Sequence, residues 1–496
     1  EIIYNISSGK KFYFNEFNLN LPLDYDRANF QQLDNIFKKL KGENYSLNSI
    51  DKILKEIDKI VLNEQYEFLK STVKEEINDN LIDLTFDIGE SEKFYVEKIN
   101  ILGNNITREE VIRNNLLVDE GDAFNELLQA KTLNNLKALN FFSKVESEIT
   151  DSIKENKKII NIIVEEKPTG EIMAGAGVGT NGGTVAFGVS ENNFLGRGIE
   201  FASDLTISGE SLKGLISLNN PNYKGSNRSL NASLESSVTD QLQKFGYKST
   251  KTGFSLGSGF EIYDDLFWNT GISSYIEKLD TDSAVSSNIK KQEGTYFDTF
   301  FNQVFFYDKR NQRFKTSDGY FSRFNQNIPL ISENYTLTNG YDYKIYDEWL
   351  DENIFSFGLF LKASNSINGK DIKLSERLFV PSNKLRGFEI GKVGPKDGTD
   401  YIGGNYAASI NMATTLPKIL PNLQNTSLSI FVDAANIWGI DYDSAIGDGS
   451  KIRSSIGIAV DFFTPIGPLN FSLSEAITKG KNDITETFRF NLGTTF

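Results

Sequence analysis

The stretch "KIRSSIGIAVDFF" (451–463) decides the fold of the longer, C-terminal part of this chain. Its apolar side chains alternate with small or polar ones, which is the period of a β-strand. One face carries Ile452, Ile456, Ile458, Val460 and Phe462, and the other carries Arg453, Ser455, Gly457, Ala459 and Asp461. One apolar face and one small, polar face are typical of a strand in a transmembrane barrel, which turns its apolar face to lipid.

The same alternation recurs from residue 169 to the C-terminus, in segments bounded by Gly, Asn, Asp and Pro. We count about sixteen such segments, and short turns alternate with longer loops, as in outer-membrane barrels. The last is "TETFRFNLGTTF" (485–496), in which Phe488, Phe490, Leu492 and Phe496 face one way and Arg489, Asn491 and Gly493 the other. An open sheet edge would leave backbone groups unsatisfied in lipid, so the strands must close.

We therefore predict an all-β, antiparallel transmembrane barrel of about 16 strands over residues 169–496. The alternative is a soluble β-rich domain with half-polar sheets. Aromatic residues make up 12% of the chain, which is high for such a domain. The polar faces are also rich in Gly and Ser, and both observations favour the membrane barrel.

The N-terminal part is organised differently, because helical and strand periods alternate there. Apolar residues recur at helical spacing in 26–42 and 46–63, and two strand-like runs follow. The pattern then starts again: "ISSGKKFY" (6–13) matches "IGESEKFY" (88–95) at an offset of 82 residues. Each repeat is predicted to be a small α+β module of the order β-α-α-β-β.

These repeats divide the N-terminal part into modules at 10–90 and 91–168, with residues 1–9 as the end of a preceding, truncated module. In the second module, Thr107 and Glu110 have the spacing of a capping box at a helix start. The chain opens inside a strand-like run and without Met, so we expect that a signal peptide and further domains precede it.

Composition excludes several classes of function. The chain has 496 residues and a net charge of −15, which argues against a general nucleic-acid binder. It contains no Cys and no His, so it has neither a Ser-His-Asp triad nor a thiol nucleophile nor an ordinary zinc site. We expect no enzyme activity, no metal and no cofactor. No segment reaches the roughly 18 consecutive apolar residues of a membrane helix.

Several motifs resemble a known family. In chain order they are "VEKINILGNNITREEVIRNNLLVDEGDAF" (96–124), "LRGF" (385–388), "IGGN" (402–405), "FVDAANIWG" (431–439), "SSIGIAVDFFTPIGPLNFSLS" (454–474) and "FRFNLGTTF" (488–496). Together they resemble the POTRA-plus-barrel superfamily, and within it the outer-membrane protein assembly factors. The resemblance covers essentially the whole chain and identifies the N-terminal modules as POTRA domains.

The resemblance implies a role for "KLRGFEIGKVGPKDG" (384–398), which lies on a long sixth extracellular loop at about 364–403. In the family this loop folds back into the barrel, and acidic residues of the inner wall hold its arginine. The loop motif here is Leu385, Arg386, Gly387 and Phe388. Asp433 is the expected partner of the arginine, and Asp461 a possible second one.

One position departs from the family. The family often adds a glutamate on the strand before the partner aspartate, and the matching place here is Ala413, with Asn411 nearby. A buried arginine without enough charge compensation is costly, which is why a second acid is expected. The pair either braces the barrel or takes part in the assembly cycle.

The family also implies a weak seam between the first and last barrel strands, a lateral gate at which an incoming strand is templated. The first strand, "EIMAGAGVGTNGG" (171–183), is rich in Gly, which weakens a strand. The expected seam residues are Gly175, Gly177, Gly179, Gly493 and Phe496. On the last POTRA domain, Glu120 and Gly121 match the family's contact with a lipoprotein.

The function implied by the resemblance is that of the central subunit of the outer-membrane β-barrel assembly machinery. The expected partners are unfolded outer-membrane proteins, lipoproteins of the assembly complex, and the lipid bilayer with lipopolysaccharide; no nucleic acid is expected. The location would be the Gram-negative outer membrane, with POTRA domains in the periplasm. Alternatives are a two-partner secretion transporter for a single client, a passive channel, and, last, a barrel enzyme.

Overall fold

The computed structural model describes residues 11–22, 25–63, 69–90, 94–180, 182–313, 316–350, 353–416, 426–441, 443, 446–447, 450–464 and 467–493. The chain forms two compact units, Glu1–Pro168 and Thr169–Phe496. Among the described helices, none has the length and apolar character that a membrane-crossing helix requires.

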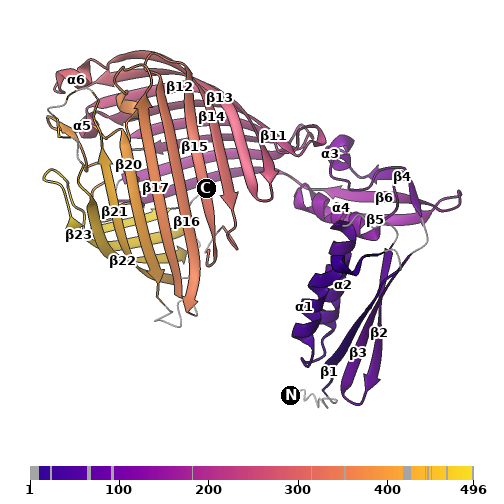
Figure 1. Cartoon of the computed structure of the whole chain (residues 1–496). Helices are drawn as coiled ribbons and strands as arrows, with labels where there is room; N and C mark the ends of the chain where they lie inside the picture. Colours follow the sequence, from indigo (N-terminus) through magenta and orange to yellow (C-terminus); the bar gives the residue numbers. More distant parts are fainter. Residues whose placement is uncertain are drawn as a thin grey trace, which may run out of the picture. The chain divides into compact units, whose positions relative to one another are not determined.

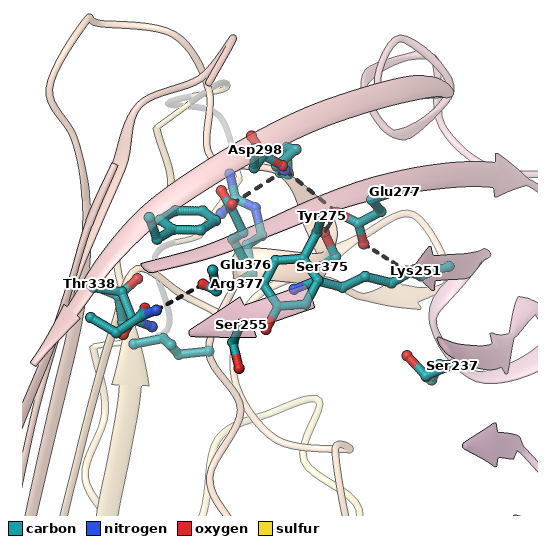
Figure 2. A pocket seen from close by; sticks show the side chains of 18 of the residues that line it. Ser237, Lys251, Ser255, Tyr275, Glu277, Asp298, Thr338, Ser375, Glu376 and Arg377 are labelled. Carbon is teal, nitrogen blue, oxygen red and sulfur yellow. Dashed lines mark hydrogen bonds and ion pairs between the residues drawn. The ribbon is translucent and has the colours of Figure 1, made fainter. Parts of the chain in front are cut away.

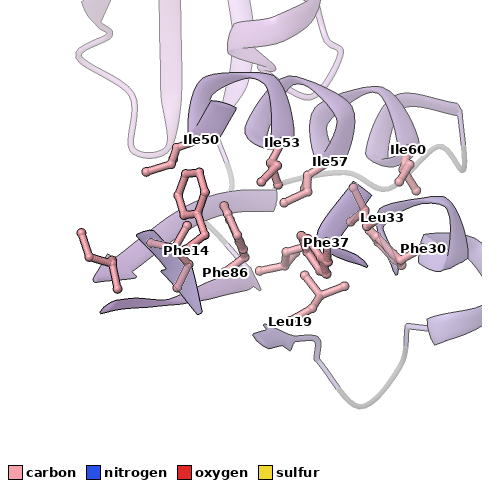
Figure 3. Packing of buried hydrophobic residues seen from close by; sticks show 13 residues of the cluster. Phe14, Leu19, Phe30, Leu33, Phe37, Ile50, Ile53, Ile57, Ile60 and Phe86 are labelled. Atoms are coloured by element: carbon pink, nitrogen blue, oxygen red, sulfur yellow. The ribbon is translucent and has the colours of Figure 1, made fainter. Parts of the chain in front are cut away.

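The first module has a three-stranded sheet of order β1-β3-β2, with β1 parallel and β2 antiparallel to the central strand. Its elements are β1 (Tyr13–Asn20), η1 (Arg27–Phe30), α1 (Gln31–Leu40), α2 (Leu47–Asn63), β2 (Leu69–Asn78) and β3 (Leu81–Glu90). The core lies between the helices and the sheet (Figure 3), where Phe37 of α1 stacks on Phe86 of β3. The apolar stripes of both helices face this core, as their spacing predicts.

The second module repeats this order, with a sheet of order β4-β6-β5. Its elements are β4 (Tyr95–Leu102), α3 (Glu109–Arg113), α4 (Glu126–Ala138), β5 (Phe142–Asp151) and β6 (Lys157–Glu166). The predicted capping box is wrong, because the N-cap of α3 is Arg108, which makes no side-chain capping bond. Instead Glu166, at the end of β6, accepts the backbone N–H groups of residues 105–107.

The second unit is a closed barrel of sixteen strands, each antiparallel to its neighbours (Figure 1). The strands are β7 (Gly170–Gly179), β8 (Gly182–Phe194), β9 (Ile199–Ser208), β10 (Ser211–Asn220), β11 (Arg228–Gln241), β12 (Tyr247–Tyr263), β13 (Leu266–Thr281), β14 (Gly294–Asp308), β15 (Gly319–Ile331), β16 (Thr336–Leu350), β17 (Asn353–Ser366), β20 (Tyr406–Thr415), β21 (Thr426–Trp438), β22 (Arg453–Thr464), β23 (Gly467–Thr478) and β24 (Phe488–Gly493). This confirms the predicted fold class.

The barrel wall has the two faces that the sequence pattern predicts. On β22, Ile456 and Ile458 point outward and are 45% and 44% exposed, whereas Ser455 and Ala459 point inward and are buried. On β13, Ile272 and Ile276 are outside while Ser273 and Glu277 are inside. An apolar exterior and a polar interior are the surfaces that a barrel presents to lipid and to its lumen.

One long loop, residues 367–405, joins β17 to β20. Within it are η3 (Leu374–Glu376) and the short strands β18 (Lys396–Asp397) and β19 (Asp400–Tyr401); the shorter loops of the barrel carry η2 (Tyr223–Gly225), α5 (Leu242–Phe245) and α6 (Ser287–Lys290). Much of the long loop is buried against the inner wall. The final loop (479–487) joins β23 to β24.

Candidate functional site

The tip of the long loop is packed into the barrel by its apolar side chains. Leu385 and Phe388 are buried in one cluster with Val393 of the same loop and Ile437 of β21. Burying an aromatic and two aliphatic side chains stabilises this position by several kcal/mol, at about 25 cal/mol per Å² of apolar surface. The loop is therefore part of the barrel's interior.

Arg386 and Asp433 meet in a two-point fork. Arg386 Nε lies 2.7 Å from Asp433 Oδ2, and Nη2 lies 2.8 Å from Oδ1. The backbone N–H of Arg386 donates to the same carboxylate at 3.1 Å. Asp433 is inaccessible to solvent, and the guanidinium stacks on the ring of Phe431 at 3.3 Å from its centre. A paired, bidentate geometry of this kind compensates the buried charge and fixes the orientation of the loop tip.

Asn411, rather than Ala413, occupies the wall position next to this pair. In the register of β20 and β21, Asn411 lies opposite Asp433, whereas Ala413 lies opposite Phe431. Asn411 Nδ2 donates at 2.8 Å both to Asp433 Oδ1 and to the carbonyl of Lys384. A neutral amide therefore stands at the wall position that we assigned to Ala413, and it donates to Asp433 in addition to Arg386.

The expectation that Asp461 supplies a second carboxylate is wrong. Ser455 is the register partner of Asp433, and Asp461 lies six residues further along β22, about 20 Å away at the rise of a strand. There Asp461 accepts a hydrogen bond from Asn470 of β23. Distance along the strand therefore separates it from Arg386.

Gly387 allows the tip to lie against the wall. Its φ of +86° is in the left-handed region, and an added Cβ would come within 2.9 Å of Ser455 Cβ. The hydroxyl of Ser455 donates to the carbonyl of Arg386 at 2.5 Å. A larger residue at position 387 would strain the backbone and break this contact.

A second anchor, which the sequence analysis missed, holds the start of the long loop (Figure 2). Lys373 is buried, with Nζ 2.5 Å from Asp298 of β14 and 3.4 Å from Glu277 of β13. Glu376 of the loop lies 3.3 Å from the same ammonium. Beside it is a polar cavity of about 560 Å³. Three carboxylates around one lysine form an ion-pair network that joins the loop to the wall.

The long loop also contacts the final loop through a buried pair. Arg453 Nε of β22 lies 2.8 Å from Asp483 Oδ2, and Asp483 Oδ1 accepts the N–H of Gly394 at 3.2 Å. Burial raises the pKa of Asp483, but the hydrogen bonds and charge of Arg453 outweigh it and hold the pKa below its usual value. The carboxylate therefore stays charged and connects two loops to one strand.

Among the described residues, the seam between the last and first strands is short. Residues 491–493 of β24 pair with 177–179 of β7, whereas the other edge of β7 pairs with β8 along 170–179. Gly175, Gly177 and Gly179 share the inner face of β7 by their alternate spacing. A Cβ on Gly179 would lie 2.4 Å from the Asn491 side chain and 2.8 Å from the Phe490 carbonyl. The seam thus depends on this glycine; Phe496 lies outside the described residues.

Glu120 and Gly121 are part of the internal bonding of the second module. Glu120 Oε1 accepts the N–H of Ile99 at 3.0 Å, just after the register shift between Val96 and Lys98 of β4, and lies 3.8 Å from Arg113 Nη1. Gly121 has φ +103° and donates to the carbonyl of Val96 at 2.8 Å. The acidic side chain remains partly exposed.

Comparison with known proteins agrees with this architecture. Residues 94–167 match the POTRA model described as "Surface antigen variable number repeat", and residues 193–496 match the Omp85 superfamily domain. The chain is similar to outer membrane protein assembly factor BamA of Neorickettsia risticii (strain Illinois), with 25% identity over 449 residues, which is 88% of this chain and 60% of that protein. The chain thus spans less than two thirds of that relative's length.

Solved structures show the same fold. BamA from Haemophilus ducreyi lacking POTRA domains 1–3 superimposes with a TM-score of 0.80 at 21% identity, covering 98% of this chain and 100% of that one. CdiB from Acinetobacter baumannii is less similar, with a TM-score of 0.52 at 13% identity, over 98% of this chain and 91% of that one. The family model covers more than half of the chain, and the chain belongs to the Omp85 superfamily.

Proposed function

We propose that this chain is the central subunit of an outer-membrane β-barrel assembly machinery, which folds client barrels at its own seam. The observation that carries the proposal is the uneven pairing of β7. Among the described residues, one edge of β7 pairs over ten residues with β8 and the other over three with β24. A partly paired strand edge in lipid can receive a client strand through main-chain hydrogen bonds, which is β-augmentation.

The physical reason for this mechanism is the cost of unpaired backbone groups in a bilayer. A client strand cannot enter lipid alone, since each unsatisfied N–H or C=O costs several kcal/mol. Pairing with β7 satisfies one edge of the client strand as it enters. The inner-face glycines of β7 add few side-chain contacts to the β24 pairing, so exchange of partners is easy. No covalent chemistry, metal or cofactor takes part.

The proposal assigns residues 10–90 and 91–168 to two POTRA domains in the periplasm and residues 169–496 to the barrel in the bacterial outer membrane. The matching sheet orders of the two modules support the assignment of the first. Residues 1–9, assigned to the end of a preceding POTRA domain, lie outside the described residues.

The proposed partners follow from these surfaces. Unfolded outer-membrane proteins would be received by the POTRA modules and then by the seam. A lipoprotein of the assembly complex would contact Glu120 and Gly121, between α3 and α4, where the carboxylate of Glu120 is partly exposed. The apolar outer face of the barrel would contact the bilayer and lipopolysaccharide.

The proposal is tested by depleting the protein in its host and quantifying every outer-membrane barrel. A broad fall across unrelated barrels is the expected result. Loss of one exported protein, with other barrels at their normal level, would instead identify a two-partner secretion transporter. Complementation with the wild-type chain is the control, since it must restore whichever barrels were lost.

A further inference from the structure

The tip of the long loop contacts the last strand of the barrel as well as the wall. Phe388 forms an antiparallel bridge with Thr485 of the final loop. The N–H of Glu389 donates to the carbonyl of Ile484 at 2.9 Å, and the N–H of Glu486 donates to the carbonyl of Gly387 at 3.1 Å. The residues that lead into β24 therefore form a short ladder with the loop motif.

Arg489, on β24, completes this contact. It is 6% exposed and points into the barrel. Nη1 donates to the carbonyl of Ser382 at 2.8 Å, and Nη2 donates to the carbonyl of Phe388 at 2.6 Å. Glu486 accepts from Nε at 2.8 Å and balances the charge. One guanidinium thus bonds to the loop just before the motif and at the last residue of the motif.

These contacts matter because the first residues of β24 have no register partner on β7. Phe488 and Arg489 pair with β23, at Leu473 and Ser472, while pairing with β7 begins at Asn491. Among the described residues, Phe488 and Arg489 are thus held by β23 on one edge and by the long loop from inside, and contact with the first strand starts at Phe490, whose carbonyl accepts the N–H of Thr180 at 3.1 Å. The position of β24 at the seam depends on the loop.

We propose that Arg489 is a positioning residue that fastens the last strand to the long loop, so that seating of the loop motif and closure of the seam change together. A loop held by the Arg386–Asp433 fork keeps the Ser382 and Phe388 carbonyls in place for Arg489. Unseating the loop removes these acceptors and frees the start of β24. The inference concerns closure of this barrel itself and holds whether or not the protein assembles other barrels.

The test measures seam closure by disulfide cross-linking of Val178→Cys and Leu492→Cys, which are register partners on β7 and β24. The chain has no other cysteine, so the cross-link is unique. Cross-linking is scored only in folded barrels, separated from unfolded protein by their mobility on unheated gels. It is compared in Arg489→Ala, in Arg489→Lys, and in Arg228→Ala as a control. Arg228 is an exposed arginine at the start of β11, with its guanidinium over Phe260.

Arg489→Ala should slow the cross-link about tenfold, the factor that corresponds to one charge-assisted hydrogen bond. Arg489→Lys should have an intermediate rate because one ammonium reaches one carbonyl, and Arg228→Ala should be unchanged. If Arg489→Ala yields no folded barrel, the Lys variant decides. Wild-type rates in the Arg489 variants would overturn the inference.

A double-mutant cycle separates positioning from simple loss of stability. Asp433→Asn, which releases the loop from the wall, should slow the same cross-link, and combining it with Arg489→Ala should add little. Non-additivity is expected when two residues act through one shared element. If the double variant instead slows the cross-link by the product of the two single-variant factors, the loop and the last strand are not coupled through Arg489.

Discussion

Arg386 and Asp433 lie 47 residues apart in the chain and form a two-point fork inside the barrel. The fork joins the tip of the long loop to β21, and the ring of Phe431 covers the guanidinium. Asp433 is inaccessible to solvent, so removing Arg386 would leave the carboxylate of Asp433 in a poorly solvated site without its counter-charge. Removing Asp433 would leave Arg386 without its carboxylate partner. The pair is therefore the main polar anchor of the loop tip.

Charge reversal tests this anchor. Arg386→Asp and Asp433→Arg alone should each lower the free energy of unfolding by on the order of 3 kcal/mol, because each creates a like-charge pair at a buried site. The double swap restores opposite charges and should recover part of that loss. Denaturant unfolding of the barrel in detergent measures all three. Asp461→Asn is the matched control, since its carboxylate contacts Asn470 and not the loop.

Neutralising Lys373 tests the second anchor. Lys373→Met leaves Glu277, Asp298 and Glu376 close together without their cation. We expect a loss of about 3 to 5 kcal/mol in stability and faster proteolysis of the long loop. Adding Glu277→Gln and Asp298→Asn should restore much of the resistance to protease. If Lys373→Met alone is as resistant as wild type, the network does not hold the loop.

Gly179→Ala tests the packing of the seam. The added methyl would overlap both the Asn491 side chain and the Phe490 carbonyl, so pairing of β24 with β7 should weaken. Gly183→Ala is the matched control on β8, because the nearest atom to its Cβ would be 3.8 Å away. Amide exchange of residues 177–179 should accelerate in the first variant and stay unchanged in the second. Equal protection in both variants would contradict the packing argument.

The second module should be sensitive to acid through Glu166. Partial burial raises the pKa of Glu166, but hydrogen bonds from residues 105–107 outweigh it and hold the pKa below the usual 4.5. A carboxyl whose pKa is lower when folded adds stability above its unfolded pKa and loses it as pH falls through the folded pKa. Exchange of these amides, corrected for intrinsic rates, should therefore accelerate below about pH 4.5. Glu166→Gln should remove this pH dependence. If exchange in the Glu166→Gln variant keeps the wild-type pH profile, Glu166 is not the group responsible.

Periodicity was sufficient to predict both halves of the fold. Strict alternation in segments such as 451–463 predicts lipid-facing strands, and the 82-residue repeat predicts two modules of like order. The loop motif and Asp433 came from the family resemblance, and the structure brings them together. These features depend on local residue patterns or on short motifs, so a single sequence is sufficient to predict them.

Register and long-range pairing were not predictable in the same way. Choosing Asn411 over Ala413 would have required the exact alignment of β20 with β21, because a shift of two residues places the wrong side chain opposite Asp433. Asp461 lies on the inward face of β22, as expected, but six residues along the strand from Ser455, which is the residue opposite Asp433. Lys373 joins residues 75 and 96 positions away, so no local pattern marks it.

Arg489 shows a related limit. Its place on the polar face of the last strand was evident from alternation, but its two acceptors are backbone carbonyls of the long loop. Carbonyl groups are present at every residue, so the sequence does not show which ones an arginine will reach. In the same way, Glu166 replaces the predicted capping box from a strand 59 residues away.

We propose that client strands enter at the β7–β24 seam, and a reversible lock on that seam tests this entry site. Oxidised Val178→Cys/Leu492→Cys protein, with the POTRA modules intact, would be reconstituted with its partners and assayed for insertion of unrelated barrels. A lock across β7 and β8, Ala176→Cys/Val185→Cys, is the control, since those residues are also register partners. We predict that the seam lock stops insertion, that reduction restores it, and that the control lock has no effect. Normal insertion of unrelated barrels by the oxidised protein would mean that clients do not enter at the β7–β24 seam.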